Sequence, residues 1–148
     1  MKRKVHVVPH THWDREWYFT TSRSKVYLMK DFKDVLDTLE TKKEFRYFML
    51  DAQGSLLDDY IKWMPADKER IKKLVKEKRL IIGPWYTQSD QLVISGESIV
   101  RNMYYGMKCC EESVSYTHLL LYQQKNLVQF YLKFYQDLMR LQMFPIWH

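Results

Sequence analysis

The fold is decided by VHVVPHTHWDREWY, residues 5–18. The first half of this stretch is short, β-branched and closed by Pro9, whose nitrogen cannot donate to a neighbouring strand, so we expect a buried strand that ends at Pro9. The polar second half then follows the carboxyl end of that strand. In parallel α/β sheets and barrels, ligands bind at this edge.

His12 and Asp14 are the candidate metal ligands of this stretch. They lie two residues apart, so in an extended segment their side chains project to the same side and can converge on one ion. His10 shares that parity and could join them. Imidazole nitrogen and carboxylate oxygen suit zinc or a similar divalent ion. From these residues alone, it is equally reasonable to interpret the histidines as loop residues that form hydrogen bonds and bind no metal.

The rest of the chain alternates between helical and strand patterns. Apolar residues at three- and four-residue steps predict a helix over residues 24–42, with Val26 on its apolar face. Further helices are expected over residues 56–64, after a capping Asp67, and over residues 95–112. Short apolar runs predict buried strands at residues 47–50 and 80–83. This order of elements predicts a parallel sheet with helical crossovers, an α/β fold.

Three strand ends therefore come side by side in the predicted sheet. They carry His12 with Asp14, then Asp51 with Gln53, then residues 85–90. We assign Asp51 to substrate binding, although a turn or helix cap explains it equally well. Trp17 and Trp85 have polar neighbours, which favours a lip that stacks on a sugar over packing in the core.

Composition sets limits on the function. The net charge is +6, but basic and acidic residues interleave over residues 67–78, which indicates a solvated helix face and no nucleic-acid partner. No apolar stretch reaches the ~20 residues that span a bilayer, so we expect a soluble, cytoplasmic protein without a membrane partner. Cys109 and Cys110 are adjacent, which predicts reduced thiols on a helix. The oligomeric state stays open.

Three motifs together resemble the N-terminal catalytic domain of the glycoside hydrolase family 38 α-mannosidases: VVPHTHWDREWY (7–18), IIGPWYTQSD (81–90) and SGESIVRN (95–102). The similarity runs over residues 5–112 and is greatest to the bacterial mannosylglycerate hydrolases. It implies a partial parallel-stranded (β/α) barrel-like domain. Because a complete barrel takes about 250 residues, this interpretation makes the 148 residues a fragment.

The resemblance also implies a zinc-dependent retaining α-mannosidase acting on α-mannosides such as mannosylglycerate or its phosphorylated form. It makes His12, Asp14 and Asp90 zinc ligands, with Asp90 also the catalytic nucleophile, and it places Trp17 under the mannose ring. Separately from the resemblance, we assign Trp85 to substrate binding because of its polar neighbours. Such an enzyme needs a second carboxyl group about 5–5.5 Å from the nucleophile to protonate the leaving oxygen.

The sequence departs from the family after residue 113. The family's acid/base aspartate and its later histidine ligand have no counterpart, so we expect this chain alone to be inactive. Residues 114–148 contain one acidic residue, Asp137, and no glycine, and VSYTHL at 114–119 resembles a reading frame of a transposon-end adapter. We interpret residues 1–113 as part of the catalytic domain and residues 114–148 as a non-native tail. The alternative is a true amphipathic helix over residues 119–141.

Two other functions fit the motifs. A metal-dependent deacetylase or amidohydrolase would use His10 and His12 to bind a metal that activates water. A non-catalytic sugar-binding module would use Trp13, Trp17 and Trp85 without any metal.

Overall fold

The structure, a computed structural model, describes residues 3–114. In chain order it consists of α1 (Thr21–Thr41), β1 (Phe48–Met49), α2 (Gly54–Trp63), a short 3-10 helix η1 (Pro65–Asp67), α3 (Lys68–Lys76), β2 (Leu80–Ile81) and α4 (Gly96–Val114). Each predicted helix is present within a few residues of its expected bounds. Apart from Val114, the proposed tail lies outside the described residues.

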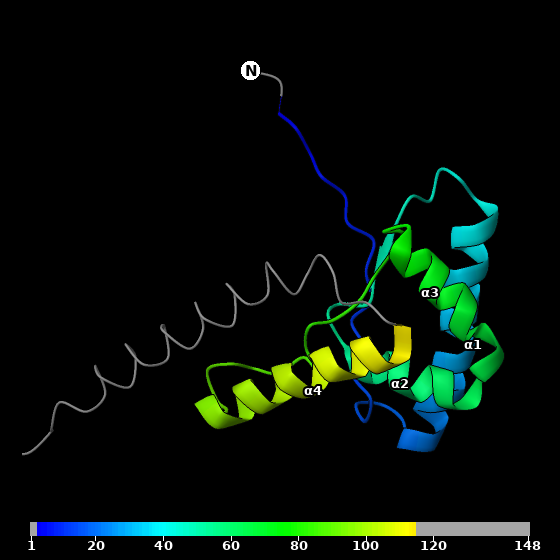
Figure 1. Ribbon diagram of the computed structural model, residues 1–148. Coiled ribbons are helices and arrows are strands. Elements are labelled where there is room, and N and C mark those ends of the chain that lie inside the picture. The colour runs from blue at the N-terminus through cyan, green and yellow to red at the C-terminus, as the bar shows by residue number, and fades with distance from the viewer. Residues whose placement is uncertain (1–2, 115–148) are drawn as a thin grey trace, which may run out of the picture.

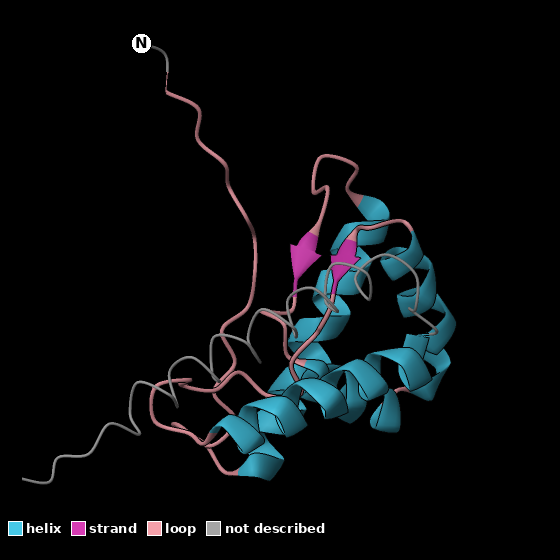
Figure 2. Cartoon of the chain, turned by 60° about the vertical axis from the view of Figure 1, so that its left-hand side comes forward, coloured by secondary structure: helices cyan, strands magenta, loops and turns pink. Residues whose placement is uncertain are grey.

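The two strands form a parallel pair, in which Phe48 lies beside Leu80 and Met49 beside Ile81. The connection between them runs through α2, η1 and α3, as the alternation of patterns predicts. Figure 2 shows the two strands side by side among the helices. The protein is therefore a mixed α/β structure that is mostly helical, with its strands parallel.

The prediction of a buried strand at residues 5–9 is wrong. Val5, Val7 and Val8 are 81%, 76% and 47% exposed, and the N-terminal segment projects away from the helices (Figure 1). Pairing with β1 begins only at the end of the run, where His10 forms a parallel bridge with Met49. Within residues 3–114 no element covers these valines, so the burial that would favour a strand is missing.

The core lies where α1, α2 and α3 pack together under the strands. It is built from side chains such as Leu36, Leu57 and Ile71, which have no exposed surface. Val26 was expected on the buried face of α1 but is 68% exposed, whereas Leu28 is buried. The two residues lie about 200° apart around the helix, so only one of them can face the core. The buried face follows Leu28, Phe32, Leu36 and Leu39.

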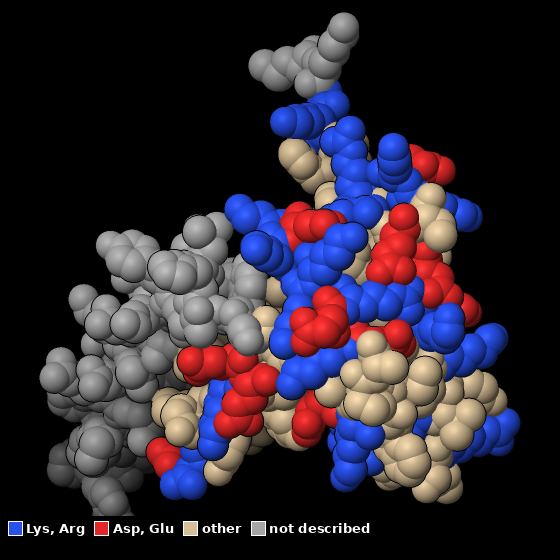
Figure 3. All heavy atoms as spheres, turned by 45° about the vertical axis from the view of Figure 1, so that its right-hand side comes forward, with Lys and Arg blue, Asp and Glu red and all other residues tan. Residues whose placement is uncertain are grey.

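Charged residues on the helices pair across elements. The Arg70 guanidinium of α3 donates hydrogen bonds to Glu40 and Asp37 of α1. These hydrogen bonds raise the pKa of Arg70 above its ordinary value. On the face shown in Figure 3, acidic and basic side chains interleave. The basic residues of this face thus have acidic neighbours within the protein.

Asp67 does not cap α3 as predicted. The 3-10 helix η1 runs directly into α3, so the backbone of Asp67 is already helical, and its carboxylate is free for other contacts. It accepts hydrogen bonds from the Tyr60 hydroxyl at 2.6 Å and from Arg70 Nη1 at 3.3 Å. Burial, followed by the contact with Asp67, raises the pKa of the Tyr60 phenol above its ordinary value.

We expect Tyr60→Phe to lower the free energy of unfolding by about 1 kcal/mol at pH 7, because it removes one buried hydrogen bond. Above pH 10 the unfolded chain releases the Tyr60 proton while the folded chain keeps it. The stability of the wild type should therefore fall with pH relative to that of Tyr60→Phe, and the difference should shrink. Urea denaturation at pH 7 and at pH 10.5 measures both effects.

Tyr104→Phe is the matched control, because Tyr104 is 57% exposed and should change stability by less than about 0.5 kcal/mol. A difference between the wild type and Tyr60→Phe that is the same at both pH values would contradict the assignment of the buried phenol.

Candidate active site

The polar N-terminal motif is held against β1 by backbone hydrogen bonds. The Met49 amide donates to the Pro9 carbonyl at 3.0 Å, and the Thr11 amide donates to the Met49 carbonyl at 3.1 Å. The Tyr47 hydroxyl adds a bond of 2.7 Å to the Val7 carbonyl. From Pro9 to Glu16 the side chains alternate between partly buried and exposed. Residues 9–14 are thus extended, which places alternate side chains on one side, as the spacing predicts, and the chain turns at Arg15 and Glu16.

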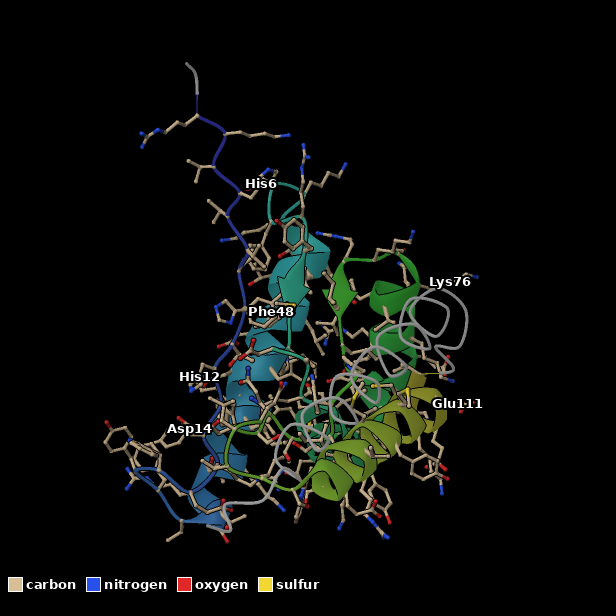
Figure 4. The ribbon with its side chains drawn as sticks, turned by 90° about the vertical axis from the view of Figure 1, so that its left-hand side faces the viewer. His6, His12, Asp14, Phe48, Lys76 and Glu111 are labelled. Atoms are coloured by element: carbon tan, nitrogen blue, oxygen red, sulfur yellow. The ribbon has the colours of Figure 1, made fainter. Side chains whose placement is uncertain are left out.

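His12 and Asp14 come together on the exposed side of this segment. His12 Nε2 lies 3.3 Å from Asp14 Oδ2. The other ring nitrogen, Nδ1, lies 3.7 Å from Asp51 Oδ2, and His10 Nδ1 lies 3.6 Å from Asp51 Oδ1. Figure 4 shows His12 and Asp14 as neighbours on the N-terminal segment, with His6 far from them. The N-terminal segment, which was predicted to be the first strand end, and the turn after β1 therefore share one cluster of two imidazoles and two carboxylates.

A salt bridge that sequence reasoning missed anchors the motif to the helices. Arg15 Nη2 donates to Asp59 Oδ2 of α2 at 2.5 Å, and Lys25 of α1 lies 3.3 Å from the other oxygen of Asp59. Trp13 packs against the hydrophobic core from the buried side of the same segment. Because Trp13 and Arg15 both point inward, they fix the outward direction of His12 and Asp14. The alternation of side chains in the motif was the signal that could have revealed this anchor.

A pocket of about 430 Å³ opens beside His12 and Asp14. Its size lies in the range of small-molecule sites. Trp17, which is 71% exposed, lies on its wall together with Tyr18, and the lining residues are His12, Trp13, Asp14, Trp17, Tyr18, Phe19, Ser24, Tyr27 and Asp31. Trp17 thus lies where a stacking residue is expected. Trp85 is partly buried and does not line this pocket.

The third strand end is held between α2 and α4. The Trp85 carbonyl accepts a hydrogen bond from the amide of Gly54 at the start of α2, at 2.7 Å. The Asn102 side chain of α4 accepts from the Thr87 amide at 2.9 Å and donates to the Thr87 carbonyl at 2.5 Å. Gly106 lets α4 approach so closely that a Cβ there would overlap the backbone of residues 84–86. Asn102 and Gly106 therefore position this loop, although neither was among the predicted site residues.

Asp90 lies three residues beyond the Asn102 clamp. Its side chain is exposed, and its Oδ1 accepts a hydrogen bond of 3.0 Å from the Leu92 amide. Within residues 3–114, no three His, Cys, Asp or Glu side chains are grouped so that they could hold one metal ion. The structure thus brings His12, Asp14 and Asp51 together but does not add Asp90 to them. The role of Asp90 stays a prediction.

Cys109 and Cys110 are free thiols on α4, as predicted. Burial raises the pKa of the Cys110 thiol to about 12, and it also raises that of Cys109. Cys110 lies against the backbone at Gly83, where φ is +55° and a Cβ would come 2.8 Å from its Sγ. These protonated thiols contribute to packing between α4 and the third strand end.

Comparison with known proteins gives the family. Residues 2–124 match the model of the glycosyl hydrolases family 38 N-terminal domain. The chain belongs to family 38. A protein of Halalkalibacterium halodurans provisionally named a mannosylglycerate hydrolase is 39% identical over 111 residues, which cover 75% of this chain and 12% of that protein. This result confirms the resemblance that the three motifs indicate.

Two solved structures share the fold of the family 38 chain. An α-mannosidase from Enterococcus faecalis superposes with a TM-score of 0.67 at 42% identity, covering 72% of this chain and 12% of that one. A second family 38 protein from Enterococcus faecalis gives a TM-score of 0.63 at 39% identity, covering 71% and 12%. The chain therefore spans about an eighth of the length of these relatives. None of the helices in the described residues of this family 38 chain is long and apolar enough to cross a membrane.

We expect Gly106→Ala to lower the free energy of unfolding of the family 38 domain by about 1–3 kcal/mol, because the new methyl group would push α4 away from residues 84–86. Gly96→Ala, at the start of the same helix, is the control and should be neutral or slightly stabilising. Urea denaturation followed by circular dichroism measures both variants. Equal stability of Gly106→Ala and Gly96→Ala would contradict the close approach of α4.

Proposed function

We propose that this chain supplies part of the active site of a zinc-dependent retaining α-mannosidase. The observation that carries the proposal is the convergence of His12 and Asp14 at the mouth of a pocket walled by Trp17, in a domain that belongs to a glycoside hydrolase family. His12 and Asp14 both belong to the polar part of the N-terminal motif, residues 5–18. Membership of family 38 favours this function over the deacetylase and over a non-catalytic sugar-binding module.

The spacing of the two donor atoms suits zinc. In a tetrahedral site with bonds of about 2.0–2.1 Å, neighbouring ligand atoms lie roughly 3.3–3.4 Å apart. His12 Nε2 and Asp14 Oδ2 are 3.3 Å apart. These two residues would hold zinc, and Asp90 would add a third ligand. When bound, zinc supplies positive charge that stabilises a carboxylate nucleophile and the hydroxyl groups of the sugar.

The remaining roles follow from where the side chains lie. The exposed face of Trp17 can stack on the apolar face of a mannose ring, and the Tyr18 ring, at 78° to the plane of Trp17, lines the pocket beside it. Asp90 would attack the anomeric carbon as an ionised carboxylate, and a second carboxyl group would protonate the leaving oxygen. Because the proposed nucleophile acts beside the zinc ligands, its loop must approach His12 and Asp14 in the active enzyme.

The proposed substrate is an α-mannoside with an acidic aglycone. Mannosylglycerate is proposed because the relative from Halalkalibacterium halodurans carries the name of a hydrolase of that compound, and the phosphorylated form is a second candidate. We further propose that the parallel pair β1 and β2 is part of a larger (β/α) barrel-like sheet in the complete catalytic domain, which places the three strand ends on one rim.

Zinc binding by the purified 148-residue chain tests the proposal. We expect the wild type to compete with a fluorescent chelator for one zinc ion. His12→Ala should weaken binding by more than the roughly 10- to 100-fold that loss of an outer-shell partner costs, because it removes a ligand. The chain alone should release no mannose, because the second carboxyl group is missing from its motifs.

His6→Ala is the matched control. It removes an imidazole from the same exposed segment but far from Asp14 (Figure 4), so it should leave the zinc affinity unchanged. Equal affinities of His6→Ala and His12→Ala would refute the assignment of His12 as a ligand.

A further inference from the structure

We propose that Asp51 is a positioning residue, which holds the His12 imidazole from behind so that Nε2 is presented beside Asp14. This inference rests on the proposed zinc site and changes the role of Asp51, which the sequence suggested as a substrate-binding residue. Asp51, in the turn after β1, thereby becomes part of a site whose proposed ligands His12 and Asp14 lie on the N-terminal segment.

The distances define the arrangement. Each oxygen of the Asp51 carboxylate faces one imidazole, Oδ1 toward His10 Nδ1 at 3.6 Å and Oδ2 toward His12 Nδ1 at 3.7 Å. The His12 ring therefore lies between two carboxylates, with Nδ1 toward Asp51 and Nε2 toward Asp14. Asp51 and Asp14 thus face different nitrogens of the ring, and within residues 3–114 these side chains are not grouped as three ligands of one ion.

Burial and backbone conformation make Asp51 the rigid partner. The Asp51 side chain is 16% exposed, compared with 66% for His12 and 51% for Asp14. Its φ is +47° and that of Ala52 is +61°, a left-handed pair that aspartate tolerates better than most residues. The turn is closed by a hydrogen bond of 3.0 Å from the Gln53 amide to the Leu50 carbonyl. The backbone that carries the carboxylate is thus held in a closed turn.

A carboxylate behind a histidine ligand has a defined chemical effect. It accepts a hydrogen bond from Nδ1–H, which keeps the ring proton on Nδ1, leaves Nε2 unprotonated and aimed at the metal, and limits rotation of the ring. At 3.7 Å the present contact is longer than a hydrogen bond, and the His12 side chain is 66% exposed, which leaves the ring room to rotate toward Asp51. The same carboxylate holds His10, whose Nδ1 also lies 3.2 Å from the Thr11 carbonyl oxygen.

Asp51→Asn in the 148-residue chain tests the inference. Asparagine has the same shape and also tolerates the left-handed backbone, so the variant should fold, which thermal melting checks. The first readout needs no metal: ¹⁵N NMR of the ring nitrogens at pH 8, with His12 assigned from the spectrum of His12→Gln. Both chains carry Asp14→Asn, which removes the carboxylate that faces Nε2 at 3.3 Å and would compete for the proton. In this background we expect His12 to carry its proton on Nδ1 when Asp51 is present, and Asp51→Asn to shift it toward a mixture of both tautomers.

The second readout is the zinc affinity from chelator competition. Asp51→Asn should raise the dissociation constant about 10- to 100-fold, the usual effect of losing an outer-shell partner. Asp34→Asn, on the exposed surface of α1, makes the same change of charge and should alter neither readout. An unchanged tautomer together with an unchanged zinc affinity in Asp51→Asn would overturn the inference. A wild-type chain that binds no zinc would instead overturn the proposed function, and the tautomer readout would still test the role of Asp51.

Discussion

The candidate site depends on one backbone interaction, the parallel pairing of Met49 with Pro9 and Thr11. Met49 uses its amide toward Pro9 and its carbonyl toward Thr11, so the register of the N-terminal segment is fixed to a single residue. A shift by one residue would turn His12 and Asp14 inward and bring Trp13 and Arg15 out. The burial of Trp13 and the salt bridge from Arg15 to Asp59 oppose that shift. Hydrogen bonds and packing therefore select the same register.

The three strand ends are held in different ways, and this explains which predicted residues meet. The first two are joined by backbone pairing and by the contacts of Asp51 with His10 and His12. The third is held by α2 and α4, through contacts of Gly54, Asn102 and Gly106 with residues 84–87. Asp90 lies beyond the support, in a turn closed by its own side chain. The proposed nucleophile thus lies outside the loop residues that Asn102 and Gly106 contact.

Sequence patterns predicted the elements whose signals are local. The helices follow from apolar periodicity, and the common orientation of His12 and Asp14 follows from the two-residue period of an extended chain. The exposed valines at residues 5–8 were mispredicted because burial depends on what packs against a strand, which no local pattern contains. Asp67 was mispredicted because η1 continues into α3, and the partner of Tyr60 is visible only in three dimensions. The contact of Asp51 with both imidazoles likewise needed the pairing of two segments about forty residues apart.

Amide hydrogen exchange at Thr11 and Met49 is the most direct test of the register on which this account depends. Both amides donate to backbone carbonyls across the pairing, so the account predicts that they exchange slowly and at similar rates, while the amides of Val5 and Val7 exchange freely. The amides of Phe48 and Leu50 donate to the carbonyls of Arg79 and Ile81, so they report on the pairing of β1 with β2 alone. If these two amides stay protected while Thr11 exchanges freely, the N-terminal motif is not docked on β1. That result would remove the basis for joining His12, Asp14 and Asp51 in one site.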